Sequence, residues 1–141
     1  MPCASHAVSL FLRRSHDGKE KTEIRYEWDA QTLVLDRRHS SLNLLVRRDL
    51  LSANYKTLAP ETINLRIFLD QSVMEVFVDG RASFAARIYP TLAETDGLAA
   101  QSFGGAGSIE SLRVHRIQLP AARPPDLVGG KYRVFRRSPG E

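Results

Sequence analysis

The chain has 141 residues, the size of one ordinary domain, and its 43% hydrophobic and 26% charged residues are typical of a folded globular protein. No apolar run approaches the ~20 residues that span a bilayer, no signal peptide is visible, and the single cysteine, Cys3, excludes an internal disulfide. Of the formal net charge of +4, residues 120–141 carry +3, so the nearly neutral body does not indicate a nucleic-acid-binding fold.

Alternation of apolar and polar residues with a period of two dominates the first third of the chain. Residues 8–13 alternate, Asp17-Gly18 marks a hairpin turn, and residues 22–29 place Thr22, Ile24, Tyr26 and Trp28 on one face. Residues 32–36 come after a short turn. This pattern predicts half-buried antiparallel strands.

The alternation is weaker between residues 37 and 62 than in the second half of the chain. Residues 42–48 fit either a short strand or a loop, and residues 55–61 contain Pro60 and lead into the next strand. Further strands are predicted at 63–69, 73–78, 82–88, 97–103 and 109–119.

About eight strands with no helical periodicity predict an all-β fold, a two-sheet antiparallel β-sandwich of the jelly-roll or lectin-like kind. We assign residues 1–119 to this β-sandwich domain. Residues 120–141 form a basic tail that contains Pro124-Pro125 and Gly129-Gly130, and we expect that tail to be disordered.

Few residues suggest catalysis or metal binding. Asp70 and Glu75 lie on one predicted hairpin and are the one acid pair worth testing against glycosidase geometry, but an Asp in a turn and a half-buried structural Glu explain them better. Gly104–Gly107 lacks the helix that a phosphate-binding loop needs and is interpreted as a hairpin turn. The four histidines have no metal-ligand spacing, so no catalytic residue, cofactor or metal is assigned.

Aromatic and basic residues have simple structural explanations as well. Tyr26 and Trp28 share a face with Ile24, which favours core packing over sugar stacking, while Tyr55 and Tyr89 fit either role. Adjacent arginines on a strand point to opposite faces, so the Arg-Arg pairs are expected on solvated edges and loops. The segment 131–137 mixes basic and aromatic residues, and disorder is expected there.

Several ordered blocks resemble the C-terminal domain of family-32 glycoside hydrolases, the invertase- and levanase-type β-fructosidases. The main block is Leu65–Gly80, which reads LRIFLDQSVMEVFVDG, and the resemblance continues through Ala86–Pro90 and Ile109–Val114. Upstream, Leu12–Gly18 and Leu33–Arg37 are also similar to that domain. The match covers roughly residues 8–119.

The resemblance implies a β-sandwich that accompanies a five-bladed catalytic propeller. The family's catalytic blocks, Asn-Asp-Pro, Arg-Asp-Pro and Glu-Cys, have no counterpart here: Asp49 precedes Leu50, and Glu27 precedes Trp28. The isolated chain is therefore not expected to be an enzyme. The family's sandwich also begins one or two strands earlier, so we expect one sheet edge to be incomplete.

These observations predict a non-catalytic accessory domain of a β-fructofuranosidase-type hydrolase, with structural support or oligomer contacts as its role in sucrose or fructan metabolism. The expected partners are a family-32-type catalytic propeller or a second copy of the chain, with neither nucleic acid nor membrane. A stand-alone, lectin-like module that binds polysaccharide weakly is the alternative. The cellular location stays open, because such enzymes are either secreted or cytoplasmic.

Overall fold

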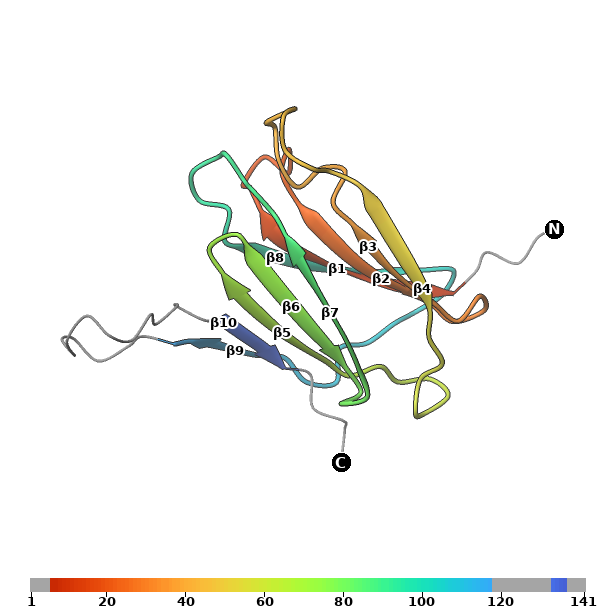
Figure 1. Ribbon diagram of the computed structural model, residues 1–141. Helices are drawn as coiled ribbons and strands as arrows, with labels where there is room; N and C mark the ends of the chain where they lie inside the picture. The colour runs from red at the N-terminus through yellow and green to blue at the C-terminus, as the bar shows by residue number, and fades with distance from the viewer. Residues whose placement is uncertain (1–5, 118–132, 137–141) are drawn as a thin grey trace. The chain divides into compact units, whose positions relative to one another are not determined.

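A computed structural model describes residues 6–117 and 133–136, which contain ten β-strands in two antiparallel sheets (Figure 1). The chain divides into two units, each of which contains one sheet. Unit 1 draws on Met1–Glu61 and Ile88–Ser108, and unit 2 on Thr62–Arg87 and Ile109–Glu141. Each unit therefore combines two separate stretches of the chain.

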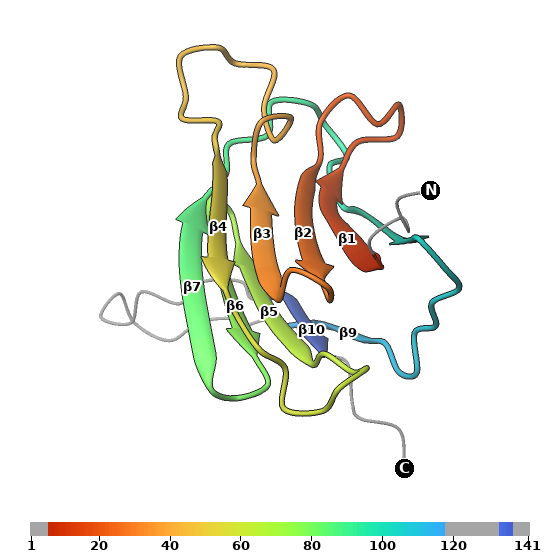
Figure 2. The ribbon, with the colours of Figure 1, turned by 90° about the vertical axis from the view of Figure 1, so that its right-hand side faces the viewer.

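The sheet of unit 1 has the strand order β4-β3-β2-β1-β8, and every pairing is antiparallel. Its strands are β1 (Ala7–Arg14), β2 (Thr22–Glu27), β3 (Thr32–Asp36), β4 (Leu50–Asn54) and β8 (Gly97–Phe103). The first strand lies inside the sheet, between β2 and β8, and β4 lies at one edge beside β3 (Figure 2).

One face of this sheet is apolar because alternate residues of neighbouring strands fall in register. Leu10 pairs with Ile24 and Ile24 with Leu35, so their side chains share a face. Leu12, Ile24, Tyr26, Leu33 and Leu35 on this sheet are all buried. The buried residues of this sheet are therefore those that the alternation in the sequence places on one face.

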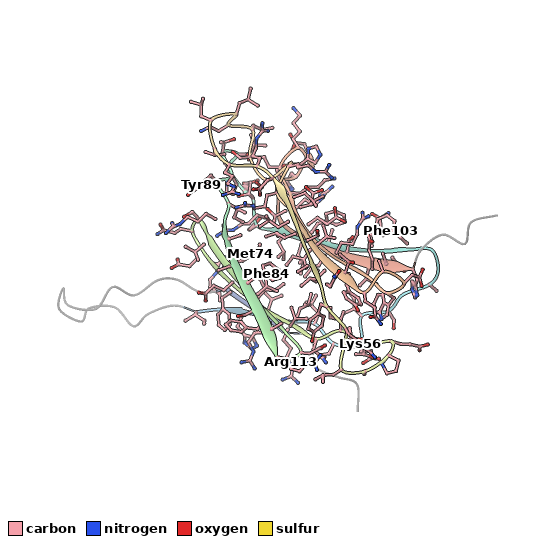
Figure 3. All side chains as sticks on the ribbon, turned by 45° about the vertical axis from the view of Figure 1, so that its right-hand side comes forward. Lys56, Met74, Phe84, Tyr89, Phe103 and Arg113 are labelled. Atoms are coloured by element: carbon pink, nitrogen blue, oxygen red, sulfur yellow. The ribbon has the colours of Figure 1, made fainter. Side chains whose placement is uncertain are left out.

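The sheet of unit 2 has the order β7-β6-β5-β10-β9. Its strands are β5 (Leu65–Asp70), β6 (Val73–Val78), β7 (Ala82–Arg87), β9 (Arg113–Arg116) and β10 (Arg133–Arg136). The buried residues of β5 and β6 are Ile67, Leu69, Met74, Val76 and Val78. Phe84 of β7 pairs with Val76 and so lies on the same face as Met74 (Figure 3).

The turn between β6 and β7 shows how local sequence ends a strand. Asp79 and Gly80 both adopt left-handed backbone conformations, with φ of 51° and 67°, which suits an Asp-Gly pair in a hairpin. The Asp79 carboxylate also accepts a hydrogen bond from the Asn64 N–H at 2.9 Å, and the Asp79 N–H donates to the Asn64 carbonyl at 2.8 Å. These bonds tie the turn to the start of β5.

The predicted all-β fold with two antiparallel sheets is confirmed, and the predicted strands at 32–36, 73–78 and 97–103 match β3, β6 and β8 to the residue. The strand β4 at Leu50–Asn54 was missed, and the strand predicted at 109–119 shrinks to β9 at Arg113–Arg116.

The interpretation of Gly104–Gly107 as a hairpin turn is wrong. The strand before it, β8, pairs with β1, whereas the strand after it, β9, pairs with β10 in the other sheet. The glycines therefore lie in a connection between sheets. Of the tail predicted at 120–141, only Arg133–Arg136 is described, as β10, and the remainder lies outside the described residues.

Candidate functional site

The acid pair singled out from the sequence lies on the outer face of the β5–β6 hairpin. Glu75 pairs with Phe68 and Asp70 with Val73, so the two carboxylates share a face, and the Leu69–Met74 pair lies between their two cross-strand pairs. Glu75 is exposed, not half-buried as expected. One carboxylate oxygen of Asp70 is buried and has no hydrogen-bond partner within the described residues. The absence of a catalytic role for this pair stays a prediction.

The aromatic residues that the sequence offered for sugar stacking form a partly buried cluster. Tyr26 is 2% exposed, and its hydroxyl donates to the Tyr55 carbonyl at 2.8 Å. Trp28 is half-buried, stacks on His6 and meets Tyr26 edge-on. The prediction that Tyr26 packs in the core is confirmed. Tyr89 is exposed but well separated from Phe103 in the same unit (Figure 3).

A second aromatic pair was missed from the sequence. Phe68 and Phe77 lie on the outer face of β5 and β6, with ring centroids 5.7 Å apart in an edge-to-face arrangement. Phe77 is 39% exposed, and its cross-strand neighbours are Arg66 and Ser83. The alternation of the two strands does place Phe68 and Phe77 on the solvent face, so this signal was present in the sequence.

A highly connected polar group of unit 1 is Glu20, which lies in the loop between β1 and β2. Its carboxylate accepts backbone hydrogen bonds from Leu42 at 2.8 Å, Thr91 at 2.9 Å and Leu92 at 2.6 Å, and one from the Thr91 hydroxyl at 3.0 Å. The residue is fully buried. Glu20 therefore joins three loops of unit 1.

Sequence reasoning had no way to find this group. Glu20 is flanked by Lys19 and Lys21, a pattern typical of a solvated charged turn. Its partners Leu42 and Thr91 are remote in sequence, and they donate through backbone N–H groups that no motif encodes. Because its carboxylate accepts hydrogen bonds from four protein donors, the geometry is that of a structural carboxylate.

The environment of Glu20 affects how the free energy of unfolding depends on pH. Burial alone would raise the pKa of Glu20, but the N–H groups of Leu92, Thr91 and Leu42 outweigh it and hold the pKa below its ordinary value of 4.5. The unfolded chain then binds a proton more readily than the folded chain. The stabilisation from Glu20 is therefore complete above about pH 4.5 and is lost as the pH falls through the lower folded pKa.

We accordingly expect the free energy of unfolding to fall on acidification less steeply in Glu20→Gln than in the wild-type chain. Urea denaturation at a series of pH values between about 7 and 3 measures both slopes. Asp36 and Asp49 also have lowered pKa values because of Arg38 and Arg37 respectively, and both remain in the variant. The difference between the two curves therefore reports Glu20, and parallel curves would contradict the assignment.

Arginine pairs were predicted on solvated edges and loops, and Arg37 is a correction to that prediction. Arg37 is 6% exposed, and its guanidinium pairs with the Asp49 carboxylate. Its backbone N–H donates to the Asp49 backbone carbonyl at 2.8 Å. Arg47 approaches the same carboxylate at 2.6 Å, whereas its neighbour Arg48 donates to the Ser41 carbonyl. The charges fix the loop between β3 and β4, and they do not form one basic patch.

Across residues 6–117 and 133–136 no group of three or more His, Cys, Asp and Glu side chains lies close enough to hold a metal ion. His16 pairs with Glu94 at 3.0 Å, and both side chains are largely exposed. The same ranges also contain no helical segment with the length and hydropathy of a membrane span. The described residues thus define an all-β domain in which the buried carboxylate of Glu20 and the Arg37–Asp49 pair hold the domain's own loops.

Comparison with known families supplies the class of this domain. Residues 3–116 match the family described as the C-terminal region of glycosyl hydrolases family 32. The match covers most of the 141 residues, so the chain belongs to this family. It holds the non-catalytic C-terminal domain, and the catalytic propeller is absent from these 141 residues.

Two relatives agree with this family assignment. A levanase of Bacillus sp. (strain L7) is 36% identical over 112 residues, and an extracellular exo-inulinase of Aspergillus awamori is 29% identical over 109 residues. These alignments cover 77% and 74% of this chain but only 12% and 20% of the relatives. The chain therefore corresponds to a small part of each relative's length.

A solved structure shows the same fold. The crystal structure of exo-inulinase from Aspergillus awamori superposes with a TM-score of 0.55 and 19% identity, over 96% of this chain and 25% of that chain. At this identity the likeness concerns the fold alone. Together with the family match, it accounts for an all-β chain of two antiparallel sheets.

Proposed function

We propose that this chain acts as a non-catalytic accessory domain of β-fructosidase-type carbohydrate metabolism, giving structural support or oligomer contacts to a catalytic partner. The observation that carries the proposal is the family match over residues 3–116, combined with a sequence that lacks every catalytic block of the family. The relatives are named for levan and inulin, which suggests fructans as the substrate class of the partner.

Two polar groups that hold the fold together internally suit a structural role. Glu20 joins the loops of unit 1, and the Asp79 turn is tied to the start of β5. Apolar side chains remain at the surface, among them Leu44, Leu45 and Leu58, which are more than half exposed.

The direct test is an assay of the purified chain on sucrose, inulin and levan, with calorimetric titration of the same sugars in parallel. We expect no turnover and no binding. Hydrolysis by the chain would refute the proposal, and Asp70→Asn and Glu75→Gln would then show whether the acid pair is responsible. The accessory role would be supported directly if adding this chain raised the stability of a separately produced family-32 catalytic propeller.

The outer face of β5 and β6 favours a second candidate, a lectin-like module. Phe77 is exposed beside Phe68, with Arg66 and Ser83 in the neighbouring cross-strand positions. Ligand sites commonly combine an aromatic ring with a few polar groups. In a sugar site the ring would stack on the apolar face of the sugar, and the polar groups would bind its hydroxyls. Tyr26 cannot serve this purpose because it is buried.

The same calorimetric titration separates the two candidates. Saturable heat with levan or inulin that disappears in Phe77→Ala, and survives in Tyr89→Ala, would establish the lectin-like module. Tyr89 is a suitable control because it is equally exposed, at 39%, but lies in unit 1. Binding that both variants retain would exclude the Phe68 and Phe77 face as the sugar site.

A further inference from the structure

Arginines of three different strands occupy one row of the unit 2 sheet. In the register, Arg66 of β5 pairs with Arg136 of β10, and Arg136 pairs with Arg113 of β9. Residues that pair directly across antiparallel strands lie on the same face of the sheet. Arg66 also pairs with Phe77 of the outer face, so the register places the whole arginine row on that face.

The charge of the arginine row is not balanced by its described neighbours. Arg66 and Arg113 are exposed, and neither guanidinium forms an ion pair or a hydrogen bond with another described residue. Glu75, an acid of the same face, lies one row further along, opposite Phe68, and likewise forms no ion pair with a described residue. Like charges directly opposite each other destabilise a sheet, so an anion over the row would relieve an existing repulsion.

The same row continues beyond the arginines with an aromatic ring and a hydroxyl. Phe77 is exposed and lies between Arg66 and Ser83 of β7 in the register. Neighbouring strands lie about 4.8 Å apart, so the three arginines span roughly 10 Å, and Phe77 and Ser83 extend the row by about as much again. One half of the row is therefore cationic, and the other half is uncharged.

We propose that this row, from Arg113 to Ser83, binds an acidic oligosaccharide, with its anionic groups over the arginines and an uncharged sugar ring over Phe77. Arginine is well suited to bind carboxylate groups, and an aromatic ring suits the apolar face of a sugar. The inference rests on the lectin-like candidate, with which it shares Phe77, and deepens it by naming the charge of the ligand.

A nucleic acid fits the row less well than an oligosaccharide with sparse acidic groups. A nucleic acid carries a negative charge at every nucleotide, so phosphates would also lie over Phe77, next to the exposed carboxylate of Glu75. The formal net charge of the chain is only +4, which gives a weak long-range attraction for a polyanion. Sparse acidic groups avoid the repulsion from Glu75 because they leave the Phe77 end uncharged.

Calorimetric titration of the 141-residue chain with sparsely carboxymethylated dextran is the primary test, and unmodified dextran and oligo(dT) are the comparison ligands. We expect saturable binding of carboxymethyl-dextran that weakens as the salt concentration rises. Binding of the other two ligands should be at least about tenfold weaker. The proposal is overturned if carboxymethyl-dextran does not bind, or if either comparison ligand binds as tightly.

Arg113→Gln and Arg116→Gln are a matched pair, because both residues are exposed and lie on β9. Arg116 pairs with Arg133, which pairs with Leu69 of the buried face, so the register places Arg116 on the opposite face from Arg113. We expect Arg113→Gln to weaken the binding of carboxymethyl-dextran about tenfold and Arg116→Gln to change it by less than about twofold. Equal losses would indicate an effect of net charge and would reject the row as the site.

The stability of Arg113→Gln shows whether a loss of binding is direct. Because the substitution removes one of two like charges that face each other across β9 and β10, the urea midpoint should be no lower than that of the wild type. A lower midpoint would contradict the repulsion on which the inference depends. Levan binding that is lost in Phe77→Ala but unaffected by Arg113→Gln would support the lectin-like candidate and reject the acidic ligand, so the two proposals fail separately.

Discussion

Replacing Glu20 by alanine should destabilise the domain by roughly 3–5 kcal/mol, the largest effect of any single polar substitution that we expect. The variant leaves the N–H groups of Leu42, Thr91 and Leu92 without their acceptor, and each buried donor without a partner costs roughly 1–3 kcal/mol. Part of that cost is relieved because water can enter the space left by the side chain. Urea denaturation followed by circular dichroism measures the loss.

The matched control is Glu94→Ala. Glu94 also lies in unit 1 and forms an ion pair, with His16, but both side chains are largely exposed. An exposed pair of this kind contributes little to stability. If Glu94→Ala and Glu20→Ala reduce the free energy of unfolding equally, Glu20 does not hold the three loops together.

Replacing Ile67 by alanine should cost about 2–5 kcal/mol, because the side chain is fully buried in unit 2 and its loss leaves a cavity in addition to the lost burial. Ile67 pairs with Val76, and Val76 pairs with Phe84, so the gap would open in the middle of the buried face of β5–β7. The same denaturation experiment measures this loss.

Glu75→Ala is the control for Ile67→Ala, since it truncates an exposed side chain on the other face of the same sheet. We expect a change within about 0.5 kcal/mol for that variant. A loss in Glu75→Ala as large as that in Ile67→Ala would mean that the outer face is covered, and would contradict the assignment of the two faces.

Strand positions and core residues could be predicted from the sequence wherever one face is buried and the other solvated. The strands β3, β6 and β8 were predicted to the residue, and the Asp79-Gly80 pair is itself a local hairpin signal between β6 and β7. The strand β4 was missed because all its residues are exposed. A strand without a buried face leaves no alternation to detect.

The polar contacts could not be predicted, because they depend on which loops meet in space. Glu20 and Thr91 are brought together by the pairing of β1 with β2 and with β8, and nothing local in the sequence indicates that neighbourhood. The absence of the family's catalytic blocks, by contrast, could be established directly, because those blocks are contiguous motifs.

The way the chain alternates between sheets has a consequence for biosynthesis. The strand β1 lies between β2 and β8, and Ala7 pairs with Phe103, so the first sheet is incomplete until the ribosome has released the residues of β8. Until then one side of β1 has no neighbour, and the intervening β5–β7 meander emerges in the meantime. Pairings this remote in sequence form slowly, so one edge of β1 stays unpaired from the synthesis of β1 until that of β8.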